Sequence, residues 1–137
     1  MTENATAIVA RAYEAFSAGD YETAASFYHP EGEIVAGNLM GPDKHFIGGP
    51  GALMDGVENA RARWESFDVH PTAMQTGSSP DVVLVQTSIF AKAHDLSVLT
   101  AWTTWAVVTI QDSLIKSYRV FYTEKEARLA AGLATED

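Results

Sequence analysis

Two long runs of β-forming residues stand close together in the second half of the chain: Ser97-Val-Leu-Thr-Ala-Trp-Thr-Thr-Trp-Ala-Val-Val-Thr-Ile110 and Leu114-Ile-Lys-Ser-Tyr-Arg-Val-Phe-Tyr122. Only Gln111-Asp112-Ser113 separates them, and these polar residues suit a turn that reverses the chain. Threonine, valine, isoleucine and tryptophan favour extended backbone. The two runs therefore predict a β-hairpin at the centre of an antiparallel sheet. Neither run alternates cleanly between apolar and polar residues, so we expect helices to cover one face and a second copy of the chain the other.

The remaining sequence predicts an early group of helices and three further strands. Apolar side chains recur every three or four positions in four segments, which is typical of amphipathic helices. Pro71 suits an edge strand, and Thr123 with Glu126 forms a capping-box pattern before the last helix. Helices followed by a meander of strands indicate an α+β fold. The expected helices span residues 5–18, 21–28, 52–67 and 124–133, and the expected further strands span 33–36, 69–75 and 82–93.

Length and composition limit the kind of protein this is. A chain of 137 residues with 47% hydrophobic residues predicts one globular domain over residues 1–137. The 18 acidic and 9 basic residues give a net charge of −9, which argues against a nucleic-acid or anionic-membrane partner. The absence of cysteine excludes thiolate catalysis, disulfides and cysteine-based zinc sites. No run predicts a membrane span, and the first residues lack a signal-peptide pattern, so we expect a cytoplasmic protein.

Four short motifs carry a resemblance to a known family: Tyr13-Glu-Ala-Phe-Ser-Ala-Gly-Asp20, Phe27-Tyr-His-Pro-Glu31, Tyr118-Arg-Val-Phe-Tyr122 and Glu126-Ala-Arg-Leu-Ala-Ala-Gly-Leu133. Together with the order of elements, they resemble the SnoaL-like branch of the nuclear transport factor 2-like superfamily. The resemblance implies a strongly curved sheet wrapped as a cone around N-terminal helices, a pocket between them, and a homodimer formed across the convex face. Relatives include polyketide cyclases, ketosteroid isomerase, scytalone dehydratase and limonene epoxide hydrolase, so the fold does not decide the function.

Three alanines stand where the resemblance to ketosteroid isomerase would place its reactive groups. The oxyanion-hole tyrosine falls on Ala12, the proton-abstracting aspartate on Ala36 and the oxyanion-hole acid on Ala106. A shift of one residue brings Tyr13 or Trp105 to these places, and neither restores a carboxylic acid. Alanine can neither take a proton nor hold an enolate. We therefore expect no isomerase chemistry of that form, and no replacement for the aspartate of a polyketide cyclase is evident.

Strand alternation predicts the pocket lining. Gln86 is the sharpest candidate, because an amide in an apolar cavity must bond an interior tyrosine or await a ligand carbonyl. Tyr118 is either an acid or a core residue, and His45 is either a general base at the pocket mouth or a solvated loop histidine. The histidines His29, His45, His70 and His94 are too scattered to predict a metal site, and no cofactor is expected. The catalytic candidates are His45, Gln86 and Tyr118, and the ligand-binding candidates are Tyr13, Phe16, Trp64, Ser88, Phe90, Trp102, Thr104 and Tyr122.

These patterns leave three functional hypotheses. The leading hypothesis is a cyclase, isomerase or lyase of secondary metabolism that lacks the usual aspartate. Its pocket would bind a small, hydrophobic, oxygen-bearing polyketide- or terpenoid-like molecule. The second is a non-catalytic ligand-binding or dimerisation domain. The third is a hydrolase in which Glu33, Asp43 or Asp55 activates water, although strand alternation places Glu33 outside the pocket. The predicted homodimer face consists of Val83, Val85, Ile89, Trp105 and Val107.

Overall fold

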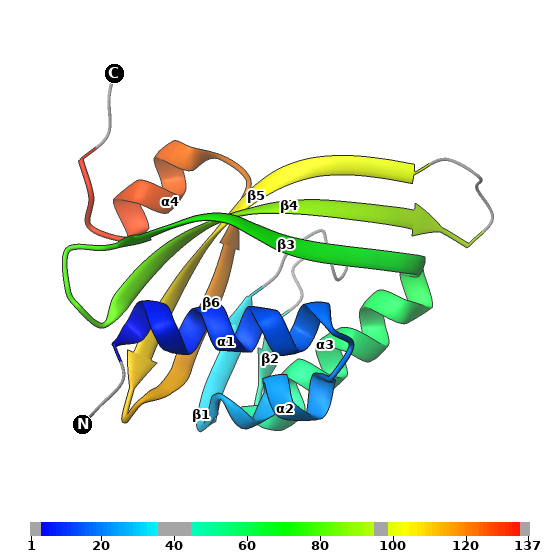
Figure 1. Cartoon of the computed structure of the whole chain (residues 1–137), viewed down its shortest axis with the longest axis horizontal. Helices are drawn as coiled ribbons and strands as arrows, with labels where there is room; N and C mark the ends of the chain where they lie inside the picture. Colours follow the sequence, from blue (N-terminus) through cyan, green and yellow to red (C-terminus); the bar gives the residue numbers. More distant parts are fainter. Residues whose placement is uncertain (1–3, 36–44, 95–98, 135–137) are drawn as a thin grey trace.

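The computed structural model describes residues 4–35, 45–94 and 99–134. Within them helices and strands follow the predicted α+β order, except for one short strand at His45–Ile47 that the sequence did not predict. The elements lie along the chain as drawn in Figure 1. They are α1 (Ala5–Ser17), α2 (Tyr21–Ser26), β1 (Tyr28–Val35), β2 (His45–Ile47), α3 (Pro50–Arg63), β3 (Trp64–Thr76), β4 (Val82–Ala93), β5 (Leu99–Gln111), β6 (Leu114–Phe121) and α4 (Glu124–Ala130).

The strands form one six-stranded sheet in the order β2-β1-β6-β5-β4-β3. Strands β5 and β6 lie at its centre and pair antiparallel, so the predicted central hairpin is confirmed. Gln111 pairs with Leu114, which shortens the turn to Asp112 and Ser113, with φ angles of 56° and 63°. Two positive φ angles suit the twist of a two-residue hairpin turn. Strand β1 lies on the other side of β6 and pairs with it in parallel, which is the one parallel pair among the described strands.

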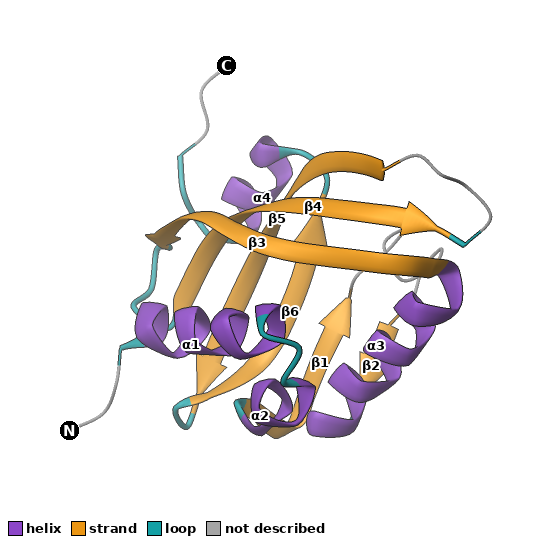
Figure 2. Ribbon diagram, turned by 45° about the vertical axis from the view of Figure 1, so that its right-hand side comes forward, coloured by secondary structure: helices purple, strands orange, loops and turns teal. Residues whose placement is uncertain are grey.

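The sheet is curved and open, and its two faces are covered unequally. Helices α1, α2 and α3 lie on the concave face, whereas α4 lies against the opposite face near β5 (Figures 1 and 2). Ile8 and Val9 of α1 are buried in the main core together with the aliphatic residues of β4 and β5. A smaller cluster of Leu84, Val107, Ala127 and Ala131 lies beneath α4. The predicted α+β roll around N-terminal helices is therefore confirmed.

Side-chain caps fix the starts of α2 and α4. Asp20 accepts a hydrogen bond from the Thr23 amide and starts α2, while Gly19 before it takes a φ of 80°. Thr123 accepts from the Glu126 amide and donates to the Glu126 carboxylate. This is the predicted capping box. Pro71 lies on β3, which is an edge strand of the sheet, as expected.

Three predicted helix ends were wrong. The last helix ends at Ala130 rather than at residue 133, and two others end early because the residues that follow them pair in the sheet. The second helix ends at Ser26, since the Phe27 carbonyl accepts a hydrogen bond from the Ile115 amide at 2.8 Å and Tyr28 enters β1. The third helix ends at Arg63, and Trp64 already pairs with Ala93 in β3. None of the helices in the described ranges is long and apolar enough to cross a membrane. The cytoplasmic location stays a prediction.

The predicted orientation of β4 was also wrong. Val83, Val85 and Ile89, expected on the outer dimer face, are at most 1% exposed and pack in the main core on the concave side. Gln86, Ser88 and Phe90 occupy the alternate positions and hence the convex face. The helices cover the concave face, so the larger aliphatic side chains of β4 must point that way. Trp105 and Val107 do lie on the convex face, but α4 covers Val107.

Candidate functional site

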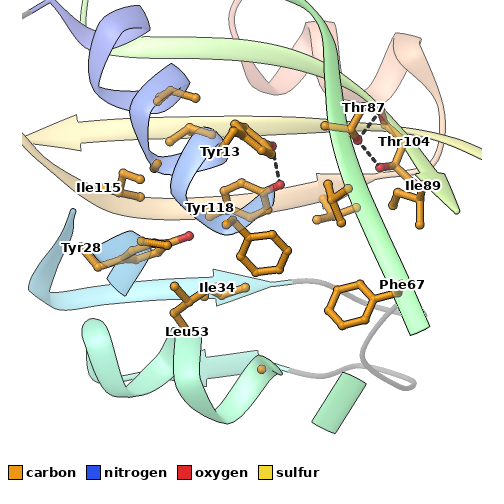
Figure 3. Close-up of a pocket in the computed structure, with 18 residues that line it drawn as sticks. Tyr13, Tyr28, Ile34, Leu53, Phe67, Thr87, Ile89, Thr104, Ile115 and Tyr118 are labelled. Carbon is orange, nitrogen blue, oxygen red and sulfur yellow. Dashed lines mark hydrogen bonds between the residues drawn. The ribbon is translucent and has the colours of Figure 1, made fainter. Parts of the chain in front are cut away.

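A cavity lies between the concave face of the sheet and helices α1, α2 and α3. The empty space is about 770 Å³ when the open solvent at its mouth is included, so the enclosed part is smaller. Gly56 of α3 contributes no side chain to this wall, which keeps space where a larger residue would fill it. The lining residues are drawn in Figure 3: Val9, Ala12, Tyr13, Phe16, Ala24, Tyr28, Ile34, Leu53, Gly56, Phe67, Val69, Thr87, Ile89, Thr104, Val108, Ile115, Tyr118 and Val120.

The polar groups on this wall are all hydroxyls, and two of them form a tyrosine pair. The hydroxyl oxygens of Tyr13 in α1 and Tyr118 in β6 lie 2.5 Å apart (Figure 3). Burial raises the pKa of Tyr118 to about 12, and the hydrogen bond with Tyr13 partly offsets this rise. Burial, then charge interaction and hydrogen bonding with Tyr118, raise the pKa of Tyr13 well above its ordinary value. Either hydroxyl can donate to the other, so the pair uses one of its two protons and keeps the second for a further acceptor.

Two threonines on adjacent strands form a second hydroxyl pair in the same wall. Thr87 of β4 and Thr104 of β5 face each other in the antiparallel register, and both are at most 2% exposed. Their hydroxyl oxygens lie 2.7 Å apart, and the Thr87 hydroxyl also lies 3.1 Å from the Thr104 backbone carbonyl. Thr87 can therefore donate to the carbonyl while it accepts from the Thr104 hydroxyl. The pair is satisfied within the protein.

Among the described residues, the cavity wall carries no formal charge. None of its lining residues is an aspartate, glutamate, histidine, lysine or arginine. Burial raises the pKa of Tyr28, the third tyrosine, above its ordinary value, and the nearby Tyr118 adds to this. All three phenols therefore stay protonated at neutral pH and act as neutral donors or acceptors. The cavity suits an uncharged, mostly apolar molecule that presents oxygen to these hydroxyls.

Four of the residues predicted from the sequence come together in this wall: Tyr13, Phe16, Thr104 and Tyr118. Trp64 and Trp102 also face the concave side, but they stack against one another with ring centroids 5.9 Å apart and pack on the core outside the lining. Trp64 and Trp102 therefore belong to the core and not to the cavity wall that was predicted for them.

The other predicted residues lie away from the cavity. Gln86, Ser88 and Phe90 point to the convex side because of the orientation of β4, and Tyr122 lies beyond the end of β6 with 41% exposure. His45 starts β2 and pairs with Glu33 at 2.8 Å on the outer side of the sheet. Its imidazole is therefore turned away from the cavity.

The residues considered as proton-transfer positions from the sequence lie in different parts of the structure. Ala12 lines the cavity, Ala106 is buried in the core, and Ala36 lies outside the described residues, as does Asp43. Glu33 is outside the cavity, as strand alternation predicts. Asp55 is exposed on α3.

Tyr28 and Thr87 are the polar lining residues that the sequence interpretation missed. Thr87 shares one face of β4 with Val85 and Ile89, so assigning the most apolar face of that strand to the core would have found it. Tyr28 was assigned to a helix. Pro30 and Gly32, which follow it, weaken the strand signal of β1.

Comparisons with known proteins identify the fold. No family model matches the chain, and no curated protein matches its sequence. Among solved structures, TerC co-crystallised with polyporic acid shares 14% identity over 92% of this chain and 96% of its own, with a TM-score of 0.73. An NTF2-like protein of unknown function from Burkholderia pseudomallei shares 15% identity over 90% and 94%, with a TM-score of 0.73. A Mycobacterium tuberculosis protein in complex with estradiol-17beta-hemisuccinate shares 15% identity over 90% and 97%, with a TM-score of 0.72.

Further matches include ketosteroid isomerase-like, polyketide cyclase and cystatin-fold proteins. The chain therefore has the NTF2-like fold that the sequence motifs predicted. At these identities the comparison establishes the fold and leaves the ligand and activity open.

Proposed function

We propose that this chain, with its NTF2-like fold, binds a small, neutral, mostly apolar molecule bearing an oxygen function inside the cavity. The observation that supports this most is the composition of the wall: five hydroxyl side chains among otherwise apolar residues, with no charged group. An apolar body gains from burial against such a wall, and few hydrogen bonds then orient it. A charged ligand would lose its hydration without gaining a partner.

The Tyr13–Tyr118 pair is the proposed contact for the ligand oxygen. The hydrogen bond between the two hydroxyls uses one of their two protons, so the other proton can be donated to a carbonyl. A donor that is already oriented stabilises negative charge developing on that oxygen. The pair could therefore hold a ketone and polarise it.

Any reaction in this cavity would depend on orientation and polarisation. Proton abstraction from carbon needs a base, and the lining residues include no carboxylate or imidazole. Cyclisation or isomerisation of an already reactive polyketide- or terpenoid-like compound needs less, because correct positioning alone can lower a barrier by several kcal/mol. The lack of a base equally favours a non-catalytic binding protein, which is the second candidate function.

Two of the similar structures hold ligands that share the proposed ring body and oxygen functions, although both ligands also carry an acidic group. TerC was crystallised with polyporic acid, and the mycobacterial protein with a steroid hemisuccinate. Both compounds combine an apolar ring body with oxygen functions. They support a ring-bearing, oxygen-containing ligand class for this chain as well.

A homodimer across the convex face is part of the proposal. Trp105 lies on that face, and its indole N–H is buried without a hydrogen-bond partner among the described residues. Phe90 is 37% exposed on the neighbouring strand. The cluster beneath α4 includes Leu84 and Val107, with Trp105 packed at its side, and among the described residues Phe90 lies outside this cluster, where a second copy could pack.

A pair of matched probes tests the binding proposal. Calorimetric titration of the protein with 1-tetralone and with its hydrocarbon counterpart tetralin compares two ligands that differ in the carbonyl oxygen. We expect 1-tetralone to bind about fivefold to tenfold more tightly, as one hydrogen bond predicts. Equal affinity, or no binding of either compound, would contradict the proposal. NMR of reactive keto compounds incubated with the protein then separates a catalyst from a binding protein.

A further inference from the structure

Tyr28 is rigidly placed at the start of β1. It pairs with Ile115 of β6, and the Ile115 amide donates to the carbonyl of the preceding Phe27 at 2.8 Å. The pairing register between β1 and β6 shifts between Tyr28 and Glu33, so the pairing of Tyr28 is not continuous with that of the rest of the strand. Its side chain is only 7% exposed. The phenol direction is therefore set by the sheet.

The hydroxyl of Tyr28 points into the cavity and has no hydrogen-bond partner among the described residues. Figure 3 shows it directed inward from the β1 side, while the other polar groups on the wall are joined in pairs. Tyr13 is joined to Tyr118, and Thr87 to Thr104. The Tyr28 oxygen is not among the fully buried polar atoms that lack a partner, so it is accessible from the open space of the cavity, where a ligand oxygen can reach it.

Tyr28 and Tyr118 both line the cavity, and both side chains are directed into it (Figure 3). Burial first, and then charge interaction with Tyr118, raise the pKa of Tyr28, so its phenol is protonated at neutral pH. The Tyr28 proton has no acceptor among the described residues, and the Tyr13–Tyr118 pair keeps one proton that its own hydrogen bond does not use. Two free donors on one part of an otherwise apolar wall can engage two oxygens of a single ligand.

We propose that Tyr28 is a specificity-determining contact for a second oxygen of the ligand, so that the cavity selects compounds of the hydroxyketone or diketone class over simple ketones. This inference rests on the proposed function, in which the Tyr13–Tyr118 pair binds the first oxygen. The ligand then lies with its oxygen-bearing edge toward β1 and β6. Its apolar body faces the aliphatic and aromatic residues of the opposite wall.

A set of four probes tests this inference: 1-tetralone and its 2-, 3- and 4-hydroxy derivatives. Calorimetry on the wild-type protein should find one hydroxy isomer that binds about fivefold more tightly than 1-tetralone, the gain typical of one hydrogen bond. Tyr28→Phe removes the hydroxyl and keeps the ring. It should abolish the preference for that isomer and leave 1-tetralone affinity within about twofold of wild type.

Two controls separate a ligand contact from a structural role. Tyr21→Phe removes a hydroxyl from a tyrosine that packs on Phe16 but does not line the cavity, and it should leave all four affinities unchanged. Urea unfolding should show Tyr28→Phe at least as stable as wild type, because the lost hydroxyl had no partner. A less stable variant would indicate that Tyr28 is held by a trapped water only, and the inference would fall.

The outcomes also separate this inference from the proposed function. If 1-tetralone binds but no hydroxy isomer is preferred, or if Tyr28→Phe weakens all four probes equally, the role of Tyr28 is wrong while the cavity remains a binding site. If none of the four probes binds the wild-type protein, both proposals fail together.

Discussion

The hydroxyl oxygens of Tyr13 and Tyr118 lie 2.5 Å apart, although 105 positions separate the two residues in the chain. Helix α1 supplies one and the central strand β6 the other, so the pair forms only when the sheet closes over the helix. A hydrogen bond between two phenols uses one of their two protons. The remaining proton makes the pair a donor toward the cavity, and its geometry determines what the wall can bind.

Substitution of the two tyrosines should have unequal effects on a ketone ligand. Tyr118→Phe removes the proposed donor and should weaken 1-tetralone about tenfold while sparing tetralin. Tyr13→Phe leaves the Tyr118 hydroxyl in place and should cost less. Isothermal titration of both variants with both compounds checks this order. A larger loss in Tyr13→Phe would reverse the donor assignment, and an equal loss for tetralin would mean that the hydroxyl acts through packing.

The three buried phenols should make the fold sensitive to alkali. Burial raises the pKa of Tyr118 from its ordinary 10.0 to about 12, and it raises those of Tyr13 and Tyr28 as well. The folded state thus keeps protons that the unfolded chain releases above pH 10. The contribution of these phenols to the free energy of unfolding is therefore complete below pH 10. Above pH 10 the free energy of unfolding should fall by about 1.4 kcal/mol per pH unit for each phenol.

Urea unfolding at a series of pH values up to about 12 measures this slope. Tyr118→Phe deletes one of the three groups and should make the decline shallower by about one third. A free energy of unfolding that stays level up to pH 12 would show that the phenols are accessible to hydroxide in the folded state.

Substitutions of Thr87 and Thr104 should change the free energy of unfolding non-additively. Thr87→Val leaves the buried Thr104 hydroxyl without a side-chain partner and should destabilise by about 1–3 kcal/mol. Thr104→Val should cost less, because Thr87 still donates to the Thr104 carbonyl. The double variant leaves no hydroxyl unpaired and should be more stable than the sum of the single effects predicts. Simple additivity in urea unfolding would show that the two hydroxyls are not coupled.

The sequence predicted the elements well because their signals are local. The apolar spacing of α1, the cap at Asp20 and the capping box at Thr123 each depend on residues within one helical turn. The hairpin of β5 and β6 was likewise predictable from its own composition and short turn. The family resemblance extended these local signals to the whole fold.

The site was less predictable, because it depends on which way a strand faces. In β4 the consecutive residues Val83, Leu84 and Val85 are all apolar, so the pattern near the start of the strand suits either face. The polar residues Gln86 and Ser88 were assigned to a pocket, but the helices on the concave side require the aliphatic positions. Tyr28 could not be placed, since only the pairing with β6 fixes its direction.

The convex face should hold two copies of the chain together. Phe90 lies on that face beside Ser88 and Gln86, away from the part that α4 covers. Phe90→Asp would bury a carboxylate without a partner in the interface, so it should dissociate the dimer. Met54→Asp is the matched control, because Met54 is 44% exposed on α3 at the opposite side of the sheet. Sedimentation at micromolar concentration should show a dimer for wild type and Met54→Asp and a monomer for Phe90→Asp. A monomeric wild-type protein would refute the dimer, and a dimeric Phe90→Asp variant would move the interface to another surface.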